Sequence, residues 1–156
     1  MTASDIKIDE IVYTINLELR IPYTLGQLII LFEQAGLKIR KYGLKNLPKV
    51  MVVSPDDEVK GYYQDYDYAI YTVEDYPEIT ADMICYLERG CECYENGTEF
   101  YPDFVTTQKL YPWYLTEIYE DVVGNLLFQK ELPTMDDYIF GLKYYLRYDA
   151  FYDFSC

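Results

Sequence analysis

The chain has 156 residues, of which 27 are acidic and 13 basic, so its formal net charge is −14. Hydrophobic residues form 51% of the sequence, which excludes a disordered acidic tail and allows a single folded domain, 1–156, with a core of useful size. The negative charge argues against direct binding to nucleic acid or to an anionic membrane, because both would repel the chain.

No segment has the features of a membrane span or a signal peptide. The longest unbroken apolar run covers residues 28–32, whereas a membrane span needs about 20 residues. Residues 1–10 carry four charges, where a signal peptide has a basic start and an apolar stretch. We therefore expect a soluble cytoplasmic protein, which lies in the host cytoplasm if a phage encodes it.

The first third of the chain predicts a strand followed by a helix. Apolar and polar side chains alternate over residues 11–21, as is typical of a half-buried strand. Thr24 and Gln27 have the spacing of a capping box at the start of a helix. Gly36 is predicted to end that helix.

Extended structure is predicted next. The basic stretch 38–49 contains a glycine and a proline, so we predict a loop or a short extended piece there. Residues 50–53 resemble a buried strand. Residues 62–74 are rich in aromatic side chains with a period of two, which predicts a further strand.

A short helix and a hairpin are predicted in the middle of the chain. Thr80 is expected to cap a helix that runs through residue 88. Asn96-Gly97 is the preferred residue pair for a tight turn, so residues 91–101 are predicted to form a β-hairpin.

Two longer helices are predicted at the end. Pro112 suits the first turn of a helix that reaches about residue 127, and Thr134 is expected to cap a helix through about residue 148. Together, the predicted elements indicate a small α+β domain with a mainly antiparallel sheet and about four helices.

The charge is unevenly distributed along the chain. Residues 1–49 have seven bases and five acids, a net charge of +2, whereas residues 50–156 have six bases and 22 acids, a net charge of −16. Of the 20 tyrosines, 17 lie in the second part. The domain is therefore divided into a near-neutral part and an acidic, tyrosine-rich part.

The segment 61–78 has several acids and tyrosines but no base. In a strand, Asp65 and Asp67 would lie on one face about 6.6 Å apart, a repeat similar to that of successive phosphates. This pattern predicts a surface that imitates a nucleic-acid strand. The alternative is the solvated outer face of a sheet. The partner-binding residues expected here are Tyr63, Asp65, Asp67, Tyr71, Glu74 and Asp75.

A second acidic face is predicted on the helix after Pro112. Glu117, Glu120 and Asp121 have helical spacings of three and four, and such like-charge pairs are mildly destabilising. A cationic partner would relieve the repulsion, so we include them among the partner-binding residues. The alternative is neutralisation within the fold, for example by Lys109.

A basic cluster precedes the acidic part. It consists of Lys38, Arg40, Lys41, Lys45 and Lys49, of which the first four are the residues expected at a contact between two copies. We expect it to neutralise acids of the same chain or to contact the acidic part of a second copy in a homodimer. Direct contact between this cluster and nucleic acid is the alternative.

The sequence predicts no catalytic residue, no metal site and no cofactor. The chain has no histidine, which removes the usual nucleophile–base pairs. The spacing of the four cysteines favours buried or idle thiols, with a zinc site made of all four as the alternative. An enzyme that holds a metal through carboxylates such as Asp65 and Asp67 is an alternative function. The cysteines are Cys85, Cys91, Cys93 and Cys156.

An acidic surface with many tyrosines is suited to a basic protein, because arginine pairs with carboxylates and stacks on aromatic rings. In composition the chain resembles the acidic DNA-mimic inhibitors of phages and mobile elements, the anti-restriction and anti-CRISPR proteins. The resemblance implies a non-catalytic inhibitor of a basic nucleic-acid-binding protein or nuclease effector. An immunity protein or antitoxin against a basic nuclease toxin and a structural or regulatory oligomer are the alternatives.

Overall fold

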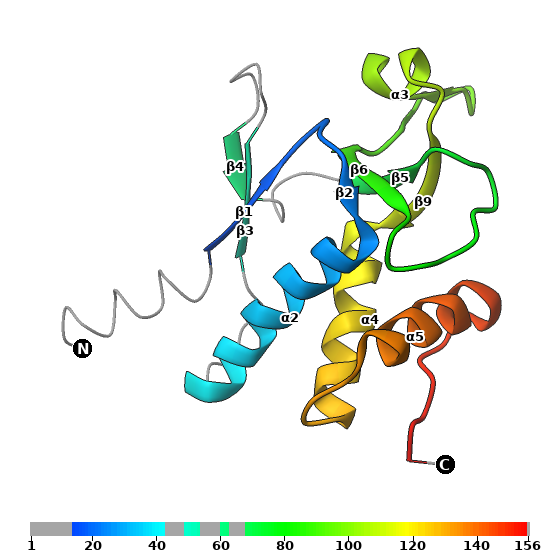
Figure 1. Cartoon of the computed structure of the whole chain (residues 1–156). Coiled ribbons are helices and arrows are strands. Elements are labelled where there is room, and N and C mark those ends of the chain that lie inside the picture. The colour runs from blue at the N-terminus through cyan, green and yellow to red at the C-terminus, as the bar shows by residue number, and fades with distance from the viewer. Residues whose placement is uncertain (1–13, 43–48, 54–59, 63–67, 156) are drawn as a thin grey trace.

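The computed structural model describes residues 14–42, 49–53, 60–62 and 68–155. Within these ranges the chain forms four helices and three sheets, which confirms the predicted α+β class (Figure 1). None of the helices in these ranges combines the length and the apolar character that a membrane span needs.

The first sheet has the strand order β1-β3-β4. β1 (Thr14–Glu18) pairs in parallel with β3 (Lys49–Val53), and β3 pairs antiparallel with β4 (Lys60–Tyr62). Parallel neighbours need a long crossover connection. Helix α2 (Leu25–Tyr42) lies in that connection.

The second sheet carries the main core and has the order β2-β6-β5-β9, with every pair antiparallel. Its central strands are β5 (Tyr68–Thr72) and β6 (Ile84–Arg89), and all five residues of β5 are buried. The edges are β2 (Tyr23–Thr24) and β9 (Tyr111–Leu115).

A small hairpin and three helices complete the fold. The hairpin pairs β7 (Glu92–Cys93) with β8 (Glu99–Phe100). The helices are α3 (Asp103–Thr107), α4 (Thr116–Gln129) and α5 (Met135–Tyr148).

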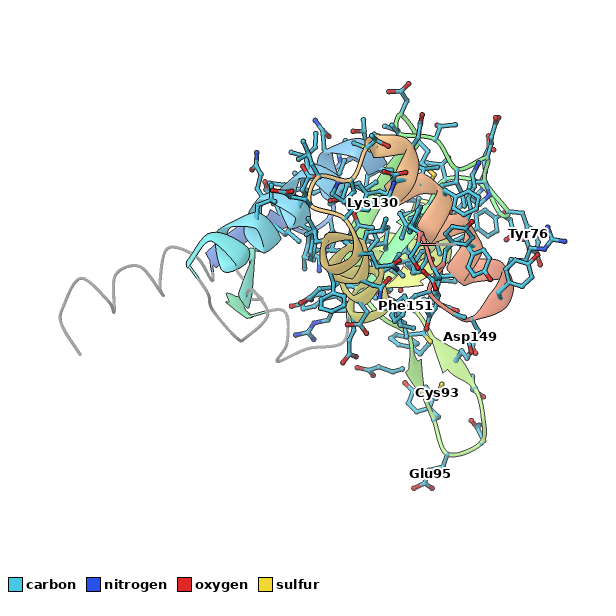
Figure 2. The ribbon with its side chains drawn as sticks, turned by 90° about the horizontal axis from the view of Figure 1, so that it is seen from below. Tyr76, Cys93, Glu95, Lys130, Asp149 and Phe151 are labelled. Carbon is cyan, nitrogen blue, oxygen red and sulfur yellow. The ribbon has the colours of Figure 1, made fainter. Side chains whose placement is uncertain are left out.

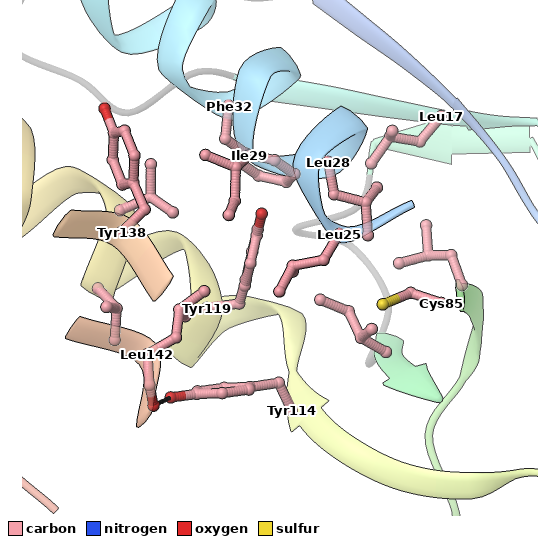
Figure 3. Close-up of a cluster of buried hydrophobic side chains, with 14 of the residues drawn as sticks. Leu17, Leu25, Leu28, Ile29, Phe32, Cys85, Tyr114, Tyr119, Tyr138 and Leu142 are labelled. Atoms are coloured by element: carbon pink, nitrogen blue, oxygen red, sulfur yellow. Dashed lines mark hydrogen bonds between the residues drawn. The ribbon is translucent and has the colours of Figure 1, made fainter. Parts of the chain in front are cut away.

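The main core lies between helices α2, α4 and α5 and the four-stranded sheet (Figure 3). Phe32 of α2 meets Tyr119 of α4 edge to face, with ring centroids 5.2 Å apart. The hydroxyl of Tyr114 on β9 donates a hydrogen bond of 2.6 Å to the carbonyl oxygen of Leu142 on α5. This buried bond joins the sheet to the last helix.

Several local predictions are confirmed. Thr24 and Gln27 form the capping box of α2, with reciprocal side chain to backbone hydrogen bonds of 2.9 and 3.1 Å. Thr134 caps α5 through the same motif with Asp137. The predicted hairpin turns at Gly97, whose φ of 83° lies in the left-handed region that suits glycine.

The predicted end of the first helix at Gly36 is wrong, because α2 continues to Tyr42. A Cβ atom at Gly36 would clash with the side chain of Leu127. The glycine therefore allows α2 to pack closely on α4 and does not end the helix.

The single strand predicted over 62–74 is wrong. β4 and β5 belong to different sheets, and residues 63–67 between them lie outside the described ranges. The short helix predicted after Thr80 is also wrong, because residues 84–89 form β6. Cys85 and Leu87 of this strand are buried at a period of two, and pairing with both β2 and β5 stabilises the extended form.

The helix predicted from Pro112 begins at Thr116, because residues 111–115 form β9. Pro112 lies opposite Tyr71, next to a register shift between the two strands. An edge strand can accept proline because one side of it makes no ladder hydrogen bonds.

Candidate partner-binding surface

An exposed acidic loop connects β5 to β6. We call residues 73–83 the acidic loop, and no lysine or arginine occurs between residues 61 and 88. In Figure 1 the loop extends towards the C-terminal end of α5. Its acidic side chains are all exposed: Glu74, Asp75, Glu78 and Asp82.

The acidic loop is attached to the fold at both of its ends. At the start, the Thr72 hydroxyl donates a 2.9 Å hydrogen bond to the carbonyl oxygen of Glu74. At the end, the backbone N–H groups of Leu25 and Gly26 donate to the carbonyl oxygens of Met83 and Ala81, each at 2.9 Å. The first N–H groups of a helix have no partner inside the helix. The loop thus satisfies the start of α2, which in turn fixes the loop.

A groove lies between the acidic loop, β9 and the last turns of α5. Its volume is about 490 Å³, within the roughly 300–1,000 Å³ range of pockets that accept small ligands or side chains. The lining combines two carboxylates with three aromatic rings and contains no base. The lining residues are Thr72, Glu74, Asp75, Tyr76, Pro77, Ile79, Tyr111, Pro112, Trp113 and Leu146.

Core contacts fix the aromatic side of the groove. Trp113 packs edge-on against Tyr114, with ring centroids 4.7 Å apart. The hydrogen bond from Tyr114 to Leu142 places α5 against β9. Leu146, one helical turn beyond Leu142, therefore lies at the groove. The groove is built mainly from segments that the core supports.

The groove has the chemistry of a site for a guanidinium group. Carboxylates accept bidentate hydrogen bonds from arginine, and aromatic faces attract its delocalised charge. Tyr76 is 94% exposed and Tyr111 41% exposed, so both side chains are accessible to a partner. Because Glu74 and Asp75 are also exposed, a cationic side chain can reach them without a rearrangement of the core.

A second acidic pair lies on α4. Glu117 and Asp121 are exposed one turn apart, as predicted. Partial burial and then repulsion by Glu117 raise the pKa of Asp121. Asp121 and Asp149 in turn contribute to the raised pKa of Tyr145, whose first cause is desolvation. The C-terminal turn of α5 therefore lies close to both the groove and this pair.

The ion pairs in the described ranges do not include the exposed carboxylates of the acidic loop and of α4. Arg20 pairs with Glu88 at 2.6 Å, and Lys130 pairs with Asp137 at 3.1 Å. Lys109, named above as an alternative source of neutralisation for α4, forms no ion pair with any residue that the structure describes. The exposed acids of the loop and of α4 thus keep their charge available to a partner.

Two of the predicted surface residues are in fact buried. Tyr71 is 0% exposed, and its hydroxyl donates a 2.8 Å hydrogen bond to the carbonyl oxygen of Arg89. It lies in the central strand β5, which is covered on both faces. Glu120 is 6% exposed, because α4 turns this side of the helix towards the protein interior. Neither side chain belongs to the exposed surface.

The structure describes only some of the remaining predicted residues. Tyr63, Asp65, Asp67 and Lys45 lie outside the described residues. Lys38, Arg40 and Lys41 belong to the last turns of α2 and not to the predicted loop.

Sequence reasoning missed the aromatic half of the groove. The helix predicted from Pro112 includes Trp113, and the sequence pattern distinguishes neither Tyr111 nor Tyr76. The signal for Tyr76 was its position in a base-free acidic segment next to Pro77. No local signal places β9 beside the loop, since that contact depends on pairing between β5 and β9.

The described thiols lie apart from the groove. Cys85 is buried in the core, and burial raises the pKa of its thiol to about 12. Cys91 and Cys93 are exposed on the β7–β8 hairpin, and in Figure 2 Cys93 lies far from Tyr76. Together with Glu99 they form the one potential metal-binding group among the residues that the structure describes.

The similarity of this chain to known proteins lies at the level of a family. No curated protein and no solved structure matches the chain. The profile of a family described as a domain of unknown function, DUF7716, matches residues 49–154. The matched segment includes the acidic loop, the groove and the hairpin. Because the match covers more than half of the chain, the protein belongs to the DUF7716 family.

Proposed function

We propose that the protein is a non-catalytic acidic inhibitor that acts in the cytoplasm on a nucleic-acid-handling protein. Its acidic, aromatic surface occupies the partner's basic nucleic-acid-binding groove. The observation that carries this proposal is the acidic loop, which presents four exposed carboxylates beside an aromatic groove without a lining base.

The distribution of charge supports a basic partner. The matched segment, residues 49–154, has 22 acids and seven bases, a net charge of −15. A surface of one sign accelerates association with a partner of the opposite sign and repels competitors of like charge. DNA and RNA are therefore poor ligands, and a protein that binds them is a suitable one.

Attachment of the acidic loop supports tight binding. A loop that is already ordered loses little conformational entropy when a partner binds. Tyr76, Tyr111 and Trp113 supply stiff aromatic contacts of the kind that dominates interface energies. In this mechanism the charge sets the association rate and the rings slow dissociation.

The test is capture of partners by the immobilised full chain from lysate of the source organism or its host. We expect captured proteins to be basic nucleic-acid binders, and duplex DNA or RNA to displace them. If nucleic acid fails to compete, or if the captured proteins are not nucleic-acid binders, the proposal is wrong.

A charge-reversal pair identifies the surface. Glu74→Lys with Asp75→Lys reverses two carboxylates at the groove. We expect a loss of partner affinity of about 100-fold or more, in line with the cost of placing like charges in an interface. Affinity is measured by surface plasmon resonance, and circular dichroism checks that the fold is unchanged.

The matched control reverses two exposed carboxylates at the hairpin, Glu92→Lys with Glu95→Lys. It changes the net charge by the same amount, so it separates a local site from bulk electrostatics. Equal losses in both double variants would show that the groove is not the binding site.

A further inference from the structure

The β7–β8 hairpin brings together two thiols and a carboxylate. Figure 2 shows it projecting from the body of the molecule with Cys93 and Glu95 on it. Cys93 lies directly opposite Glu99 in the antiparallel register. Opposite residues share one face of such a ribbon, so these two side chains are neighbours.

The neighbours of this pair in sequence extend the same face. Cys91 is two residues before Cys93, and Tyr101 is two residues after Glu99, so the pleat places all four on one side. The two sulfur atoms and a carboxylate oxygen of Glu99 lie within 4.8 Å of one another. Both thiols are free and exposed.

We propose that Cys91, Cys93 and Glu99 bind a thiophilic divalent cation, and that this cation is zinc. Zinc binds thiolate sulfur and carboxylate oxygen, usually with four ligands in a tetrahedron. Three protein donors leave the fourth position for water. As each metal–sulfur bond forms, the thiol releases its proton to solvent, and no oxidation takes place.

The geometry of the donors is close to that of a bound site. Zinc–sulfur bonds of about 2.3 Å place neighbouring ligands in a tetrahedron roughly 3.8 Å apart. The donor atoms, at separations of up to 4.8 Å, need to approach by only about 1 Å. Rotation of exposed side chains accomplishes this without a change in the backbone.

Tyr101 positions the carboxylate. Its hydroxyl donates a 3.3 Å hydrogen bond to Oε2 of Glu99, as outer-shell partners of metal ligands commonly do. The Tyr101 ring meets the ring of Tyr71 edge to face, with centroids 6.4 Å apart. Since Tyr71 is fully buried, this contact joins the donor face to the protein interior.

Electrostatics at the hairpin also favour a cation. Thiolates beside a carboxylate repel one another, and a divalent ion between them removes the repulsion.

The experiment titrates the reduced, full-length protein with Co²⁺, which reports its ligands in its absorption spectrum. We expect one cobalt ion per chain, with a thiolate-to-cobalt charge-transfer band in the near ultraviolet and d–d bands of a tetrahedral ion in the visible. Zn²⁺ should displace the cobalt and abolish these bands. If the reduced protein produces no charge-transfer band, the proposal is wrong.

Variants assign the ligands. Cys91→Ser and Cys93→Ser should each remove the tetrahedral spectrum, and Glu99→Gln should weaken cobalt binding. Tyr101→Phe should weaken it by about 10-fold, the low end of outer-shell effects. A spectrum that survives in Cys93→Ser would overturn the assignment.

Two controls complete the test. Glu92→Gln changes the adjacent residue, on the opposite face of the hairpin, and should leave the spectrum and the affinity unchanged. Cys156→Ser should also bind cobalt normally. If Cys156→Ser abolishes the band, the site is not the one formed by the hairpin.

Discussion

The acidic loop precedes β6 and the hairpin follows it, yet the two segments differ in their contacts with the rest of the protein. The carbonyl oxygens of the acidic loop accept hydrogen bonds from the first N–H groups of α2, and Ile79 and Met83 of the loop pack against the core. The hairpin has two-residue strands, and all residues from 91 to 100 are exposed.

The difference shows that exposed negative charge does not by itself define a ligand. An attached loop beside aromatic rings offers a fixed surface, which suits a large partner with many contacts. A projecting ribbon has few contacts to lose when its side chains rotate around a small ion. In the two proposals, the same acidic composition serves two different kinds of recognition.

The largest effect is expected for a core substitution in β6, the strand that connects the acidic loop to the hairpin. Leu87 on β6 is 1% exposed, and Leu87→Ala should lower the free energy of unfolding by about 2–5 kcal/mol, because it leaves a cavity. The measurement is urea denaturation. Ile84→Ala on the same strand is the control, and this partly exposed residue should cost less than about 1 kcal/mol. Equal losses would contradict the burial of Leu87.

A change of pH should separate the two sites strongly. Two thiols must lose protons to bind the metal, so the cobalt affinity of the hairpin should fall by about 100-fold per pH unit below pH 8. Partner binding by ionised carboxylates needs no proton release and should change much less between pH 8 and 6. Isothermal titration calorimetry at several pH values measures both affinities. A cobalt affinity that is independent of pH would exclude thiolate ligands.

Salt should change the partner affinity of the acidic loop more than the cobalt affinity of the hairpin, the reverse of the effect of pH. Because exposed charges are screened, partner affinity of the loop should fall by about 10-fold or more between 50 and 500 mM salt. Cobalt affinity should change by less than about 3-fold, since direct coordination is little affected by screening. The same titrations at two ionic strengths provide the measurement. Partner binding that resists salt would argue against an electrostatic surface.

The smallest effect concerns the attachment of the acidic loop. Thr24→Ala removes the cap of α2 and should cost about 1 kcal/mol. Since the N–H groups of Leu25 and Gly26 bond the loop, their hydrogen exchange should become about 5-fold faster. The amide of Gly97 in the hairpin should be unaffected. Faster exchange at Gly97 as well would show that the two regions are coupled.

Short-range features were predictable from the sequence. The capping box at Thr24, the helix cap at Thr134 and the hairpin turn at Gly97 depend on hydrogen bonds or dihedral angles within a few residues. The α+β class follows from the alternation of such signals. The exposed acids Glu74, Asp75, Glu117 and Asp121 were also identified, because charged residues remain at the surface unless a buried partner compensates them.

Pairing between strands that are far apart in the sequence accounts for the predictions that were wrong. The sequence predicts a helix from Thr80 through residue 88, but pairing with two flanking strands makes residues 84–89 the strand β6. Tyr71 was expected at the surface, yet its strand is central in the sheet and its side chain is buried. Pairing between β5 and β9 also created the groove, by placing Trp113 beside the acidic loop.

The sequence by itself determined an acidic, tyrosine-rich α+β domain with its helix caps and its hairpin turn, because composition and local hydrogen bonding decide those properties. Only the tertiary structure decided which acids lie beside aromatic rings and which beside thiols. Cys91 and Cys93 seemed to be idle thiols when judged by their spacing alone. The register that places Cys93 opposite Glu99 brings a third donor to them, since contacts across a sheet depend on chain pairing and not on distance along the sequence.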